Sequence, residues 1–416
     1  MRLCSKSAAW MFGCGVVLGV GFFASLAGAA EDLGDPVTES VDGQQFAAGP
    51  MAFRDVAFSD DGKLIATTAG LQTSQREFAV WEVGSWEKRF GYPAKQSTRT
   101  LRFSPDGKQI TVGIFSGKLT TLDAATGEVA RAVDSPDKRS DRIEYAPDGK
   151  LFAIANRRDF GISLWDGATL AARGVLKGHK KYVAAMAFSP DGKFLVSCGS
   201  DHEAILWDTA KAAAVRSLST GDRSANGVAF SADGKYVAVA SNDLHVRVFV
   251  VETGEEFAKL LSPDGTAPQR VAFMPSGKFL AIACNTPVLS FYRLERTPVA
   301  EEALKEAREL IARLDDDRYA VRQEATEKLA RLGAEVAPVV KAALAANPSD
   351  EARRRLAAVL SGLKPPKPGR VLEGHRGRID GIAFSRDGKL MATASHDATV
   401  RIWDMKTGEV IATLAE

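Results

Sequence analysis

Hydrophobic and polar residues alternate along most of the chain, in short runs that are separated by turn residues. One unit begins with an apolar strand at Val183–Phe188, continues through a Ser-Pro-Asp-Gly turn and enters a second strand at Phe194–Cys198. In such a turn proline presets φ and glycine accepts a positive φ, so the two strands form a hairpin. Strands at Ala204–Trp207 and Ala213–Leu218 complete a predicted four-stranded antiparallel sheet.

This unit recurs seven times along the chain. The turn glycines of the seven copies are Gly62, Gly107, Gly149, Gly192, Gly234, Gly277 and Gly388. The first five spacings are 42 to 45 residues, whereas the last spacing is 111 residues. A fixed period of this kind predicts a repeat architecture in which each sheet buries its faces against its neighbours. We therefore expect seven sheets packed radially into a ring, with Glu409–Leu414 as the outer strand of the last sheet.

The hydrophobic period changes from two to that of a helix in the long gap between Tyr292 and Gly369. Apolar residues of the first predicted helix share one face; they are Leu304, Ala307, Leu310, Ile311 and Leu314. Three more helices are expected: one capped by Asp317 and ended by Gly333, one opened by Pro338, and one capped by Ser349. A proline-rich linker follows at 364–368.

Two charge clusters in this gap have alternative interpretations. Asp315, Asp316 and Asp317 could hold a metal, but capping of a helix start explains them better. Arg353, Arg354 and Arg355 could bind phosphate, but a solvated helix face is the preferred interpretation.

Two dipeptides mark the strongest repeats, Gly178-His179 with Trp207-Asp208 and Gly374-His375 with Trp403-Asp404. The chain resembles the WD-repeat β-propeller family at these residues and is similar to its exported bacterial members. The other five repeats carry degenerate second dipeptides, namely Trp81-Glu82, Leu122-Asp123, Trp165-Asp166, Phe249-Val250 and Tyr292-Arg293. The resemblance implies a mainly β fold, a seven-bladed WD-repeat β-propeller with a small α-helical module inserted in blade six. That module looks HEAT-like, because the run from Asp317 to Leu332 is similar to one helix of such a repeat.

Two repeats carry the four residues of the buried hydrogen-bond tetrad of this family. The structural tetrads are His179, Ser197, Asp201 and Trp207 in one repeat and His375, Thr393, Asp397 and Trp403 in the other. A histidine and an aspartate beside a serine also suggest a hydrolase triad. A structural role is preferred, because the set occurs twice and a buried tryptophan N–H needs an acceptor.

The first thirty residues predict a secretory signal peptide. Arg2 and Lys6 precede an apolar stretch, and Ala27-Gly28-Ala29 supplies a small-residue cleavage site. The alternative is an uncleaved membrane anchor, since the apolar stretch from Ala8 to Leu26 can just span a bilayer. The expected organisation is a signal at 1–30, an N-terminal segment at 31–50, propeller blades at 51–293, the helical module at 294–367 and the end of the propeller at 368–416.

Composition and charge exclude several functions. The chain has 416 residues and a net charge of +2, from 54 basic and 52 acidic residues, which disfavours nucleic acid as a partner. Five histidines and four cysteines leave little material for a metal centre or a disulfide framework. We expect Cys198 and Cys284 to be buried thiols. We find no catalytic motif, metal set or cofactor-binding loop, so no catalytic, metal or cofactor-binding residue is predicted.

A ring of antiparallel sheets presents its second-to-third strand loops and its inter-sheet loops on one face, which we call the loop face. The candidate protein-binding residues on this face are Gln75, Arg76, Arg157, Arg158, Lys180, Lys181, His202, Asn242, Asn285, Arg376 and His396. Loops of this kind surround a central opening and are a plausible docking surface.

Two functions are therefore weighed. The first is a monomeric, non-catalytic scaffold that is exported from the cytoplasm and binds a protein or peptide through the loop face, the helical module or both. The alternative is a propeller enzyme, either a hydrolase or a quinone-dependent dehydrogenase, with its site in the central opening. An enzyme predicts a polar cluster with perturbed pKa values in that opening, whereas a scaffold predicts an exposed apolar or aromatic patch.

Overall fold

The structure is a computed structural model, and it describes most of the chain beyond residue 52. The described residues are 53–68, 77–93, 98–114, 118–134, 140–262, 264–294, 298–332, 336–346, 348–362 and 370–415. Several sequence predictions lie outside these residues: the signal peptide at 1–30, the segment at 31–50, Gln75, Arg76, Gly333 and the linker at 364–368.

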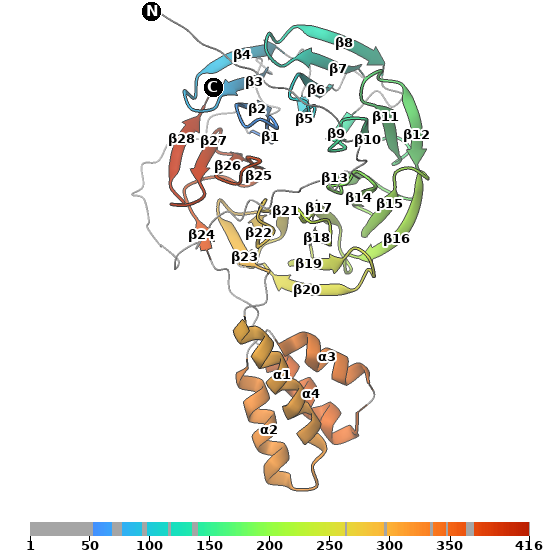
Figure 1. The fold of residues 1–416 in the computed structure, drawn as a ribbon, viewed down its shortest axis with the longest axis vertical. Helices are drawn as coiled ribbons and strands as arrows, with labels where there is room; N and C mark the ends of the chain where they lie inside the picture. The colour runs from blue at the N-terminus through green and yellow to red at the C-terminus, as the bar shows by residue number, and fades with distance from the viewer. Residues whose placement is uncertain are drawn as a thin grey trace, which may run out of the picture. The chain divides into compact units, whose positions relative to one another are not determined.

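Strands of the described residues form seven four-stranded antiparallel sheets, arranged around a central opening (Figure 1). The first four blades consist of β1 Asp55–Phe58, β2 Leu64–Thr68, β3 Glu77–Glu82, β4 Lys88–Pro93, β5 Thr98–Phe103, β6 Gln109–Ile114, β7 Lys118–Asp123, β8 Val129–Asp134, β9 Ser140–Tyr145, β10 Leu151–Asn156, β11 Ile162–Asp166, β12 Ala172–Leu176, β13 Val183–Phe188, β14 Phe194–Gly199, β15 Glu203–Asp208 and β16 Ala213–Ser219. Blades five to seven consist of β17 Ala225–Phe230, β18 Tyr236–Ser241, β19 His245–Val250, β20 Glu256–Leu261, β21 Pro268–Phe273, β22 Phe279–Cys284, β23 Leu289–Arg293, β24 Arg370–Leu372, β25 Ile379–Phe384, β26 Leu390–Ser395, β27 Val400–Asp404 and β28 Val410–Leu414. The prediction of a mainly β, seven-bladed propeller is confirmed.

The turn between the first two strands of each blade has one recurring geometry. The seven turn glycines have φ between 68° and 72°, a region that other residues enter only with strain. In blade four the Ser189 hydroxyl donates to Asp191 Oδ1 over 2.7 Å and accepts the backbone N–H of Phe194 over 2.9 Å. That serine hydrogen bond is the main reason why the pKa of Asp191 lies below its ordinary value. The turn motif therefore fixes the register of each hairpin.

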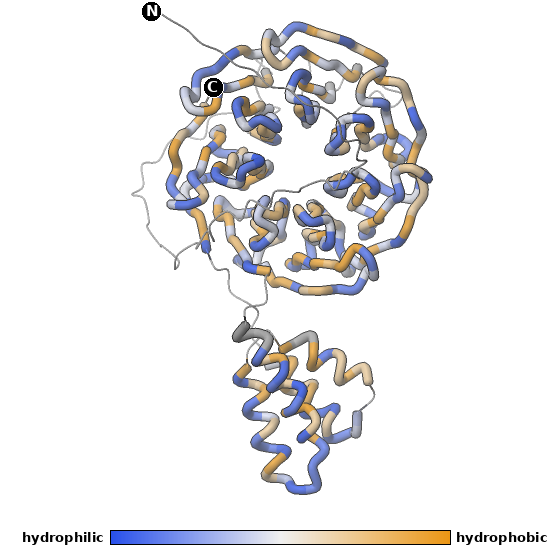
Figure 2. The backbone as a smooth tube through the Cα atoms, viewed as in Figure 1, coloured by the Kyte–Doolittle hydropathy of each residue, from blue (hydrophilic) through white to orange (hydrophobic). Residues whose placement is uncertain are grey.

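Apolar seams between neighbouring sheets hold the ring together. Between blades four and five, for example, Val196, Leu206, Val237 and Phe249 belong to one buried cluster. The first and last blades are joined in the same way: Val56, Ile65 and Trp81 of blade one pack with Ile402 and Leu414 of blade seven. Because every sheet is made of consecutive strands, this seam closes the ring without a shared strand. The alternation of polar and apolar residues that produces the seams is visible along the strands in Figure 2.

The two predicted tetrads lie inside blades four and seven. In blade four His179 Nδ1 lies 2.8 Å from Asp201 Oδ2, and His179 Nε2 lies 2.7 Å from Ser197 Oγ. The indole N–H of Trp207 donates to the same serine oxygen over 2.8 Å. The blade-seven set repeats the three distances of 2.8, 2.7 and 2.8 Å with Thr393 in place of serine. In blade seven Asp397 Oδ1 also accepts hydrogen bonds from Thr399, whereas in blade four the buried Asp201 Oδ1 has no hydrogen-bond partner among the described residues. The histidine nitrogens and the tryptophan N–H groups of both tetrads do have partners.

Other blades keep only parts of this arrangement. In blade one the Trp81 indole donates to Thr67 Oγ1 over 3.1 Å. In blade three Ile154 stands where blade four has Ser197, and the buried Trp165 N–H has no hydrogen-bond partner among the described residues. An unsatisfied buried donor costs about 1–3 kcal/mol, so the Trp165 ring is retained for its apolar packing against Phe152.

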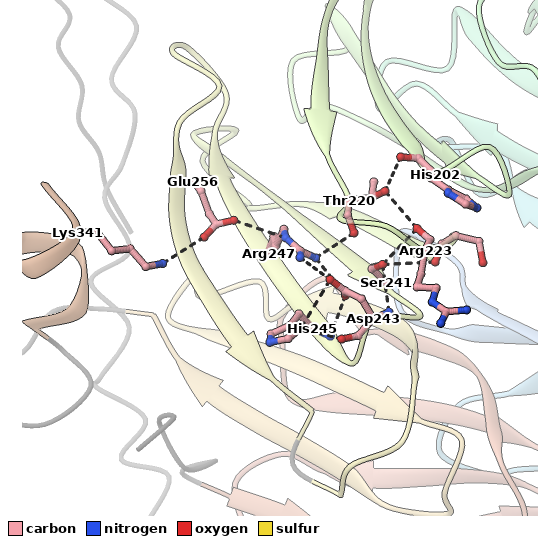
Figure 3. A network of polar contacts seen from close by, with 10 residues as sticks. His202, Thr220, Arg223, Ser241, Asp243, His245, Arg247, Glu256 and Lys341 are labelled. Carbon is pink, nitrogen blue, oxygen red and sulfur yellow. Dashed lines mark hydrogen bonds and ion pairs between the residues drawn. The ribbon is translucent and has the colours of Figure 1, made fainter. Parts of the chain in front are cut away.

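Blade five replaces the histidine of the tetrad with an arginine from another strand (Figure 3). Gly221 stands at the histidine position, and a Cβ atom there would lie 2.4 Å from Asp243 Oδ2 and 2.8 Å from Arg247 Nη2. The Arg247 guanidinium occupies the vacated space, forms an ion pair with Asp243 and donates to the Thr220 carbonyl over 3.0 Å. Its side chain is 7% exposed, so Arg247 neutralises an aspartate that stands at the tetrad position of a blade without the histidine.

In the described residues four α-helices and one 3-10 turn lie between β23 and β24 in the chain. They are α1 Pro298–Ala312, η1 Arg313–Asp315, α2 Tyr319–Arg331, α3 Ala337–Ala345 and α4 Asp350–Gly362. Their apolar faces form a separate core around Leu310, Leu329, Val340 and Leu356. β24 nevertheless pairs with β23, with Leu289 opposite Leu372, so the chain re-enters the sheet that it left.

Two predictions about these helices are wrong. Asp317 does not cap α2; the N-cap residue is Arg318, and Asp316 Oδ1 accepts the Arg318 backbone N–H over 2.9 Å. Arg353 and Arg354 are exposed, but Arg355 is not part of a solvated face. Its guanidinium lies between α2 and α4, where it contacts Glu351 over 2.7 Å and Gln323 over 3.2 Å. Ser349, in contrast, accepts the Ala352 backbone N–H over 3.1 Å, as a cap does.

We predict that Thr393→Val destabilises the protein by about 1–3 kcal/mol, because the variant leaves the Trp403 N–H and a ring nitrogen of His375 without partners. Thr413→Val on the exposed outer strand of the same blade is the matched control and should stay within about 0.5 kcal/mol of wild type. Urea unfolding followed by tryptophan fluorescence measures both variants. Equal stability of the two variants would contradict a structural role for the tetrad.

We predict that Arg247→Met lowers the free energy of unfolding by about 3 kcal/mol, because it leaves the partly buried Asp243 carboxylate without the Arg247 charge. Adding Asp243→Asn to Arg247→Met should recover part of this loss, since no unpaired charge remains. The same unfolding experiment provides the double-mutant cycle. If the double variant is no more stable than Arg247→Met alone, Arg247 does not act through Asp243.

Candidate functional site

The predicted docking residues that the structure describes lie on the loop face of the ring. Lys180 and Lys181 are exposed in the loop before β13, and Asn285 is exposed in the loop after β22. His202 is exposed between β14 and β15 at a φ of 67°, in the left-handed region. Arg376 is exposed in the loop before β25, where its backbone N–H donates to the tetrad residue Asp397 over 2.9 Å. The Lys180 N–H makes the same 2.9 Å contact with Asp201. The tetrads thus fix the conformation of these loops.

Two predicted docking residues are instead held by their own blades. Asn242 donates to Ser224 Oγ over 2.7 Å and accepts from Asn226 over 2.7 Å. His396 Nε2 lies 2.7 Å from Asp380 Oδ2 and 3.0 Å from an Arg378 nitrogen. Both side chains are only partly exposed, and their polar atoms already have partners.

Four basic residues gather on the adjoining loops of blades three and four. Arg157 and Arg158 follow β10, and Lys180 and Lys181 precede β13. The Arg157 guanidinium lies over the Tyr182 ring, 5.2 Å from its centroid, and so brings the two loops together. We call Arg157, Arg158, Lys180 and Lys181 the blade 3–4 basic patch. It is the largest group of predicted docking residues that the described structure brings together.

The innermost strands line the central opening with charged side chains. Arg102 bridges three blades: its Nη1 lies 2.7 Å from Asp55 Oδ2, and its Nη2 lies 2.6 Å from Glu144 Oε1. Burial disfavours the charged guanidinium, but the two carboxylates outweigh burial and raise the pKa of Arg102. Burial also raises the pKa of Glu144, against the opposing effect of Arg102. The opening is therefore polar, and a polar cluster with perturbed pKa values is the feature expected of an enzyme.

Two further arginines in this opening form no ion pair with a carboxylate of the described residues. Arg142 Nε donates to the Ala184 carbonyl over 2.7 Å, and Arg270 Nη1 donates to the carbonyls of Gln269 over 2.8 Å and Asn226 over 3.2 Å. Burial, and then the nearby charge of Arg142, lower the pKa of Arg270 to about 10. Asp380, in contrast, is paired with Arg378 over 2.7 Å; burial opposes its ionisation, but this pairing and His396 hold its pKa below the ordinary value.

Sequence reasoning missed these channel residues. Apart from Asp380, they lie three or one positions before the aromatic residue that precedes the turn of each blade, as Arg142 and Glu144 do before Tyr145. Aligning the seven copies would have shown charges at these positions in some blades and Ala or Gly in others.

The two cysteines that the structure describes, Cys198 and Cys284, are buried and free. Burial raises the pKa of Cys198 to about 12 and that of Cys284 to about 12, so neither is a reactive thiolate at neutral pH. Within the described ranges no three His, Cys, Asp or Glu side chains are grouped so that they could hold a metal ion. None of the helices that the structure describes is long and apolar enough to cross a membrane.

Three segments of the chain match a known family model, described as WD domain, G-beta repeat. The matched residues are 172–208, 214–249 and 366–404. Two of the segments contain the Trp-Asp dipeptides at Trp207 and Trp403, and the third reaches Phe249 in blade five.

Curated relatives match parts of the chain. Human echinoderm microtubule-associated protein-like 3 is 27% identical over 134 residues, which are 31% of this chain and 15% of the relative. Human WD repeat and SOCS box-containing protein 1 is 33% identical over 128 residues, which are 28% of this chain and 30% of the relative. The chain thus spans less than a third of the length of either relative. Together with the ring of seven four-stranded sheets, these matches support WD repeats in this chain, in the three segments that the family model covers.

Proposed function

We propose that the protein is a non-catalytic scaffold that binds a protein or peptide partner through the loop face of its propeller. The blade 3–4 basic patch is the observation that carries this proposal, because it gathers four cationic side chains on adjoining loops. The names of the relatives associate one with microtubules and another with a SOCS box, and both are WD-repeat proteins. Shared architecture supports a binding role but does not choose a partner.

The chemistry of the patch favours an acidic partner segment. Lys180, Lys181 and Arg158 are exposed, and the Arg157 side chain stacks on Tyr182. Complementary charge across an interface increases the association rate and selects the partner. An acidic peptide on the partner would therefore dock over blades three and four.

The helical segment is proposed as a second binding element, a HEAT-like module inserted in blade six. Its four helices share one core of their own, and its two flanking strands, β23 and β24, pair with each other. Insertion between paired strands costs little loop-closure entropy, so the propeller can fold without the module. Exposed helical repeats usually offer a flat or concave binding face.

The polar central opening favours a propeller enzyme as the alternative function. Its two carboxylates nearest to Arg102 are, however, bound in ion pairs at 2.7 and 2.6 Å, so they are not poised to move a proton. This pairing, rather than the polarity of the opening, leads us to prefer the scaffold.

The proposed scaffold acts outside the cytoplasm, after removal of the signal at 1–30. We expect N-terminal sequencing of protein from the native host to begin between Ala27 and Glu31, in an exported fraction. A cytoplasmic protein that keeps Met1 would overturn export, and a membrane-bound protein that keeps Met1 would favour the anchor.

We predict that Lys180→Glu with Lys181→Glu removes a partner that co-purifies with the wild-type protein after cross-linking, because the variant reverses the charge of the basic patch. The matched control is Lys211→Glu with Lys235→Glu. These two exposed lysines lie in the β15–β16 and β17–β18 connections, on the face of the ring opposite the loop face. Quantitative mass spectrometry of the captured proteins compares the variants. Loss of the same partner in both variants would indicate a general charge effect and contradict docking at the patch.

We also predict that replacing residues 297–367 with a short Gly-Ser turn leaves a folded propeller and removes at least one other captured protein. Circular dichroism and thermal melting test the fold, and loss of the cooperative melting transition would refute an independent module. An unchanged set of captured proteins would refute its binding role.

A further inference from the structure

The central opening contains a cavity of about 440 Å³ whose walls are the innermost strands. Blades four and five contribute uncharged residues to its lining, among them the small residues Ala185, Ala187, Gly227 and Ala229. At Gly227 an added Cβ atom would lie 3.0 Å from the Gln269 carbonyl oxygen, so a larger side chain there would crowd the neighbouring backbone. No charged side chain of blades four and five is among the described residues that line the cavity.

Two arginines flank this uncharged part of the lining, one on each side. Arg142 belongs to blade three and leans on blade four through the 2.7 Å hydrogen bond to the Ala184 carbonyl. Arg270 belongs to blade six and leans on blade five through the 3.2 Å hydrogen bond to the Asn226 carbonyl. Both line the cavity, and both act electrostatically on the same buried thiol, Cys198 of blade four. The two guanidinium groups thus converge over adjacent blades.

Neither arginine of this pair forms an ion pair with a carboxylate among the described residues, although Asp380 and Asp55 attract Arg270 and Glu144 attracts Arg142 at longer range. Within the part of the chain that the structure describes, Arg142 and Arg270 donate hydrogen bonds to backbone carbonyls. The acidic groups nearby are already engaged: Asp55 and Glu144 with Arg102, and Asp380 with Arg378 and His396. A nearby like charge disfavours the charged form of each arginine, and a bound anion would relieve this repulsion.

We propose that Arg142 and Arg270 form a binding site for a small oxyanion, a phosphate or carboxylate group, in the central cavity. A guanidinium presents paired N–H donors that match both groups, and hydrogen bonds to such anions are strong where water is partly excluded. Each arginine is held in position by its backbone acceptor and keeps other N–H groups available to the cavity. The site lies apart from the blade 3–4 basic patch, so it does not depend on the proposed scaffold function.

Isothermal titration calorimetry with the mature chain tests this site, with inorganic phosphate and succinate as separate probes in a buffer free of other polyvalent anions. The variants are Arg142→Met, Arg270→Met and the double substitution. Arg173→Met is the matched control, because it removes one positive charge from an exposed ion pair on the outer strand β12. The melting temperature of each unliganded variant is measured in parallel.

We expect saturable binding of one of the two probes with one site per chain. Each single channel variant should weaken it about tenfold or more, and the double variant should abolish it, while Arg173→Met binds as wild type does. Binding of phosphate alone indicates a tetrahedral oxyanion, and binding of succinate alone indicates a carboxylate.

A structural role for the two arginines makes different predictions. It predicts that Arg142→Met and Arg270→Met lower the melting temperature of the unliganded chain. If the two charges instead repel each other, removing one of them leaves this melting temperature equal or higher. The proposal is overturned if neither probe binds the wild-type chain, or if the channel variants bind as tightly as Arg173→Met. Capture of protein partners is a separate measurement, so failure of this site leaves the scaffold proposal standing.

Discussion

The structure depends on burying both faces of every sheet. A four-stranded sheet with two apolar faces is not stable alone, and each blade gains its second partner only when the ring is complete. The seam between blades one and seven is therefore the critical one, since Val56, Ile65 and Ile402 must meet although their blades stand at opposite ends of the repeat array. Among the described strands none is exchanged across this seam, where side-chain packing joins the two blades. The hydrogen bond from the Phe53 N–H to the Ser395 carbonyl, 3.0 Å long, supports it.

Closing the ring also determines where chemistry can occur. The apolar faces are consumed by the seams, so polar residues are left at the two ends of the ring and along its central opening. Tetrads such as His179 to Trp207 stiffen the loops at one end, because Asp201 also accepts the Lys180 N–H. Charges in the opening are sorted by blade: Arg102 gathers two carboxylates on one side, while Arg142 and Arg270 remain over the small residues of blades four and five.

Repeat spacing and turn chemistry made the propeller predictable from the sequence. Glycine at a recurring position, such as Gly192, marks a positive φ, and the interval to Trp207 sets the blade length. Residues outside the repeat rule were not predictable. From the sequence, Arg247 looks like a surface charge on a strand. Only the space left by the missing side chain at Gly221 shows that Arg247 is buried and pairs with Asp243. Likewise, the expected cap Asp317 does not cap α2: its neighbour Asp316 accepts the Arg318 backbone N–H, and no side chain caps the helix. Capping depends on backbone angles that composition does not encode.

The exchange at Gly221 and Arg247 constrains which sequences this blade can accept. Restoring a histidine at position 221 while Arg247 is present would place two cationic or bulky groups in one space, and the φ of 82° at this residue strains any side chain. Removing Arg247 first would leave the Asp243 carboxylate without a counter-charge. Single substitutions therefore pass through an unstable intermediate in either order. Substitutions at these two positions are therefore coupled. A screen of single variants would find that neither position tolerates substitution, although a paired change could be tolerated.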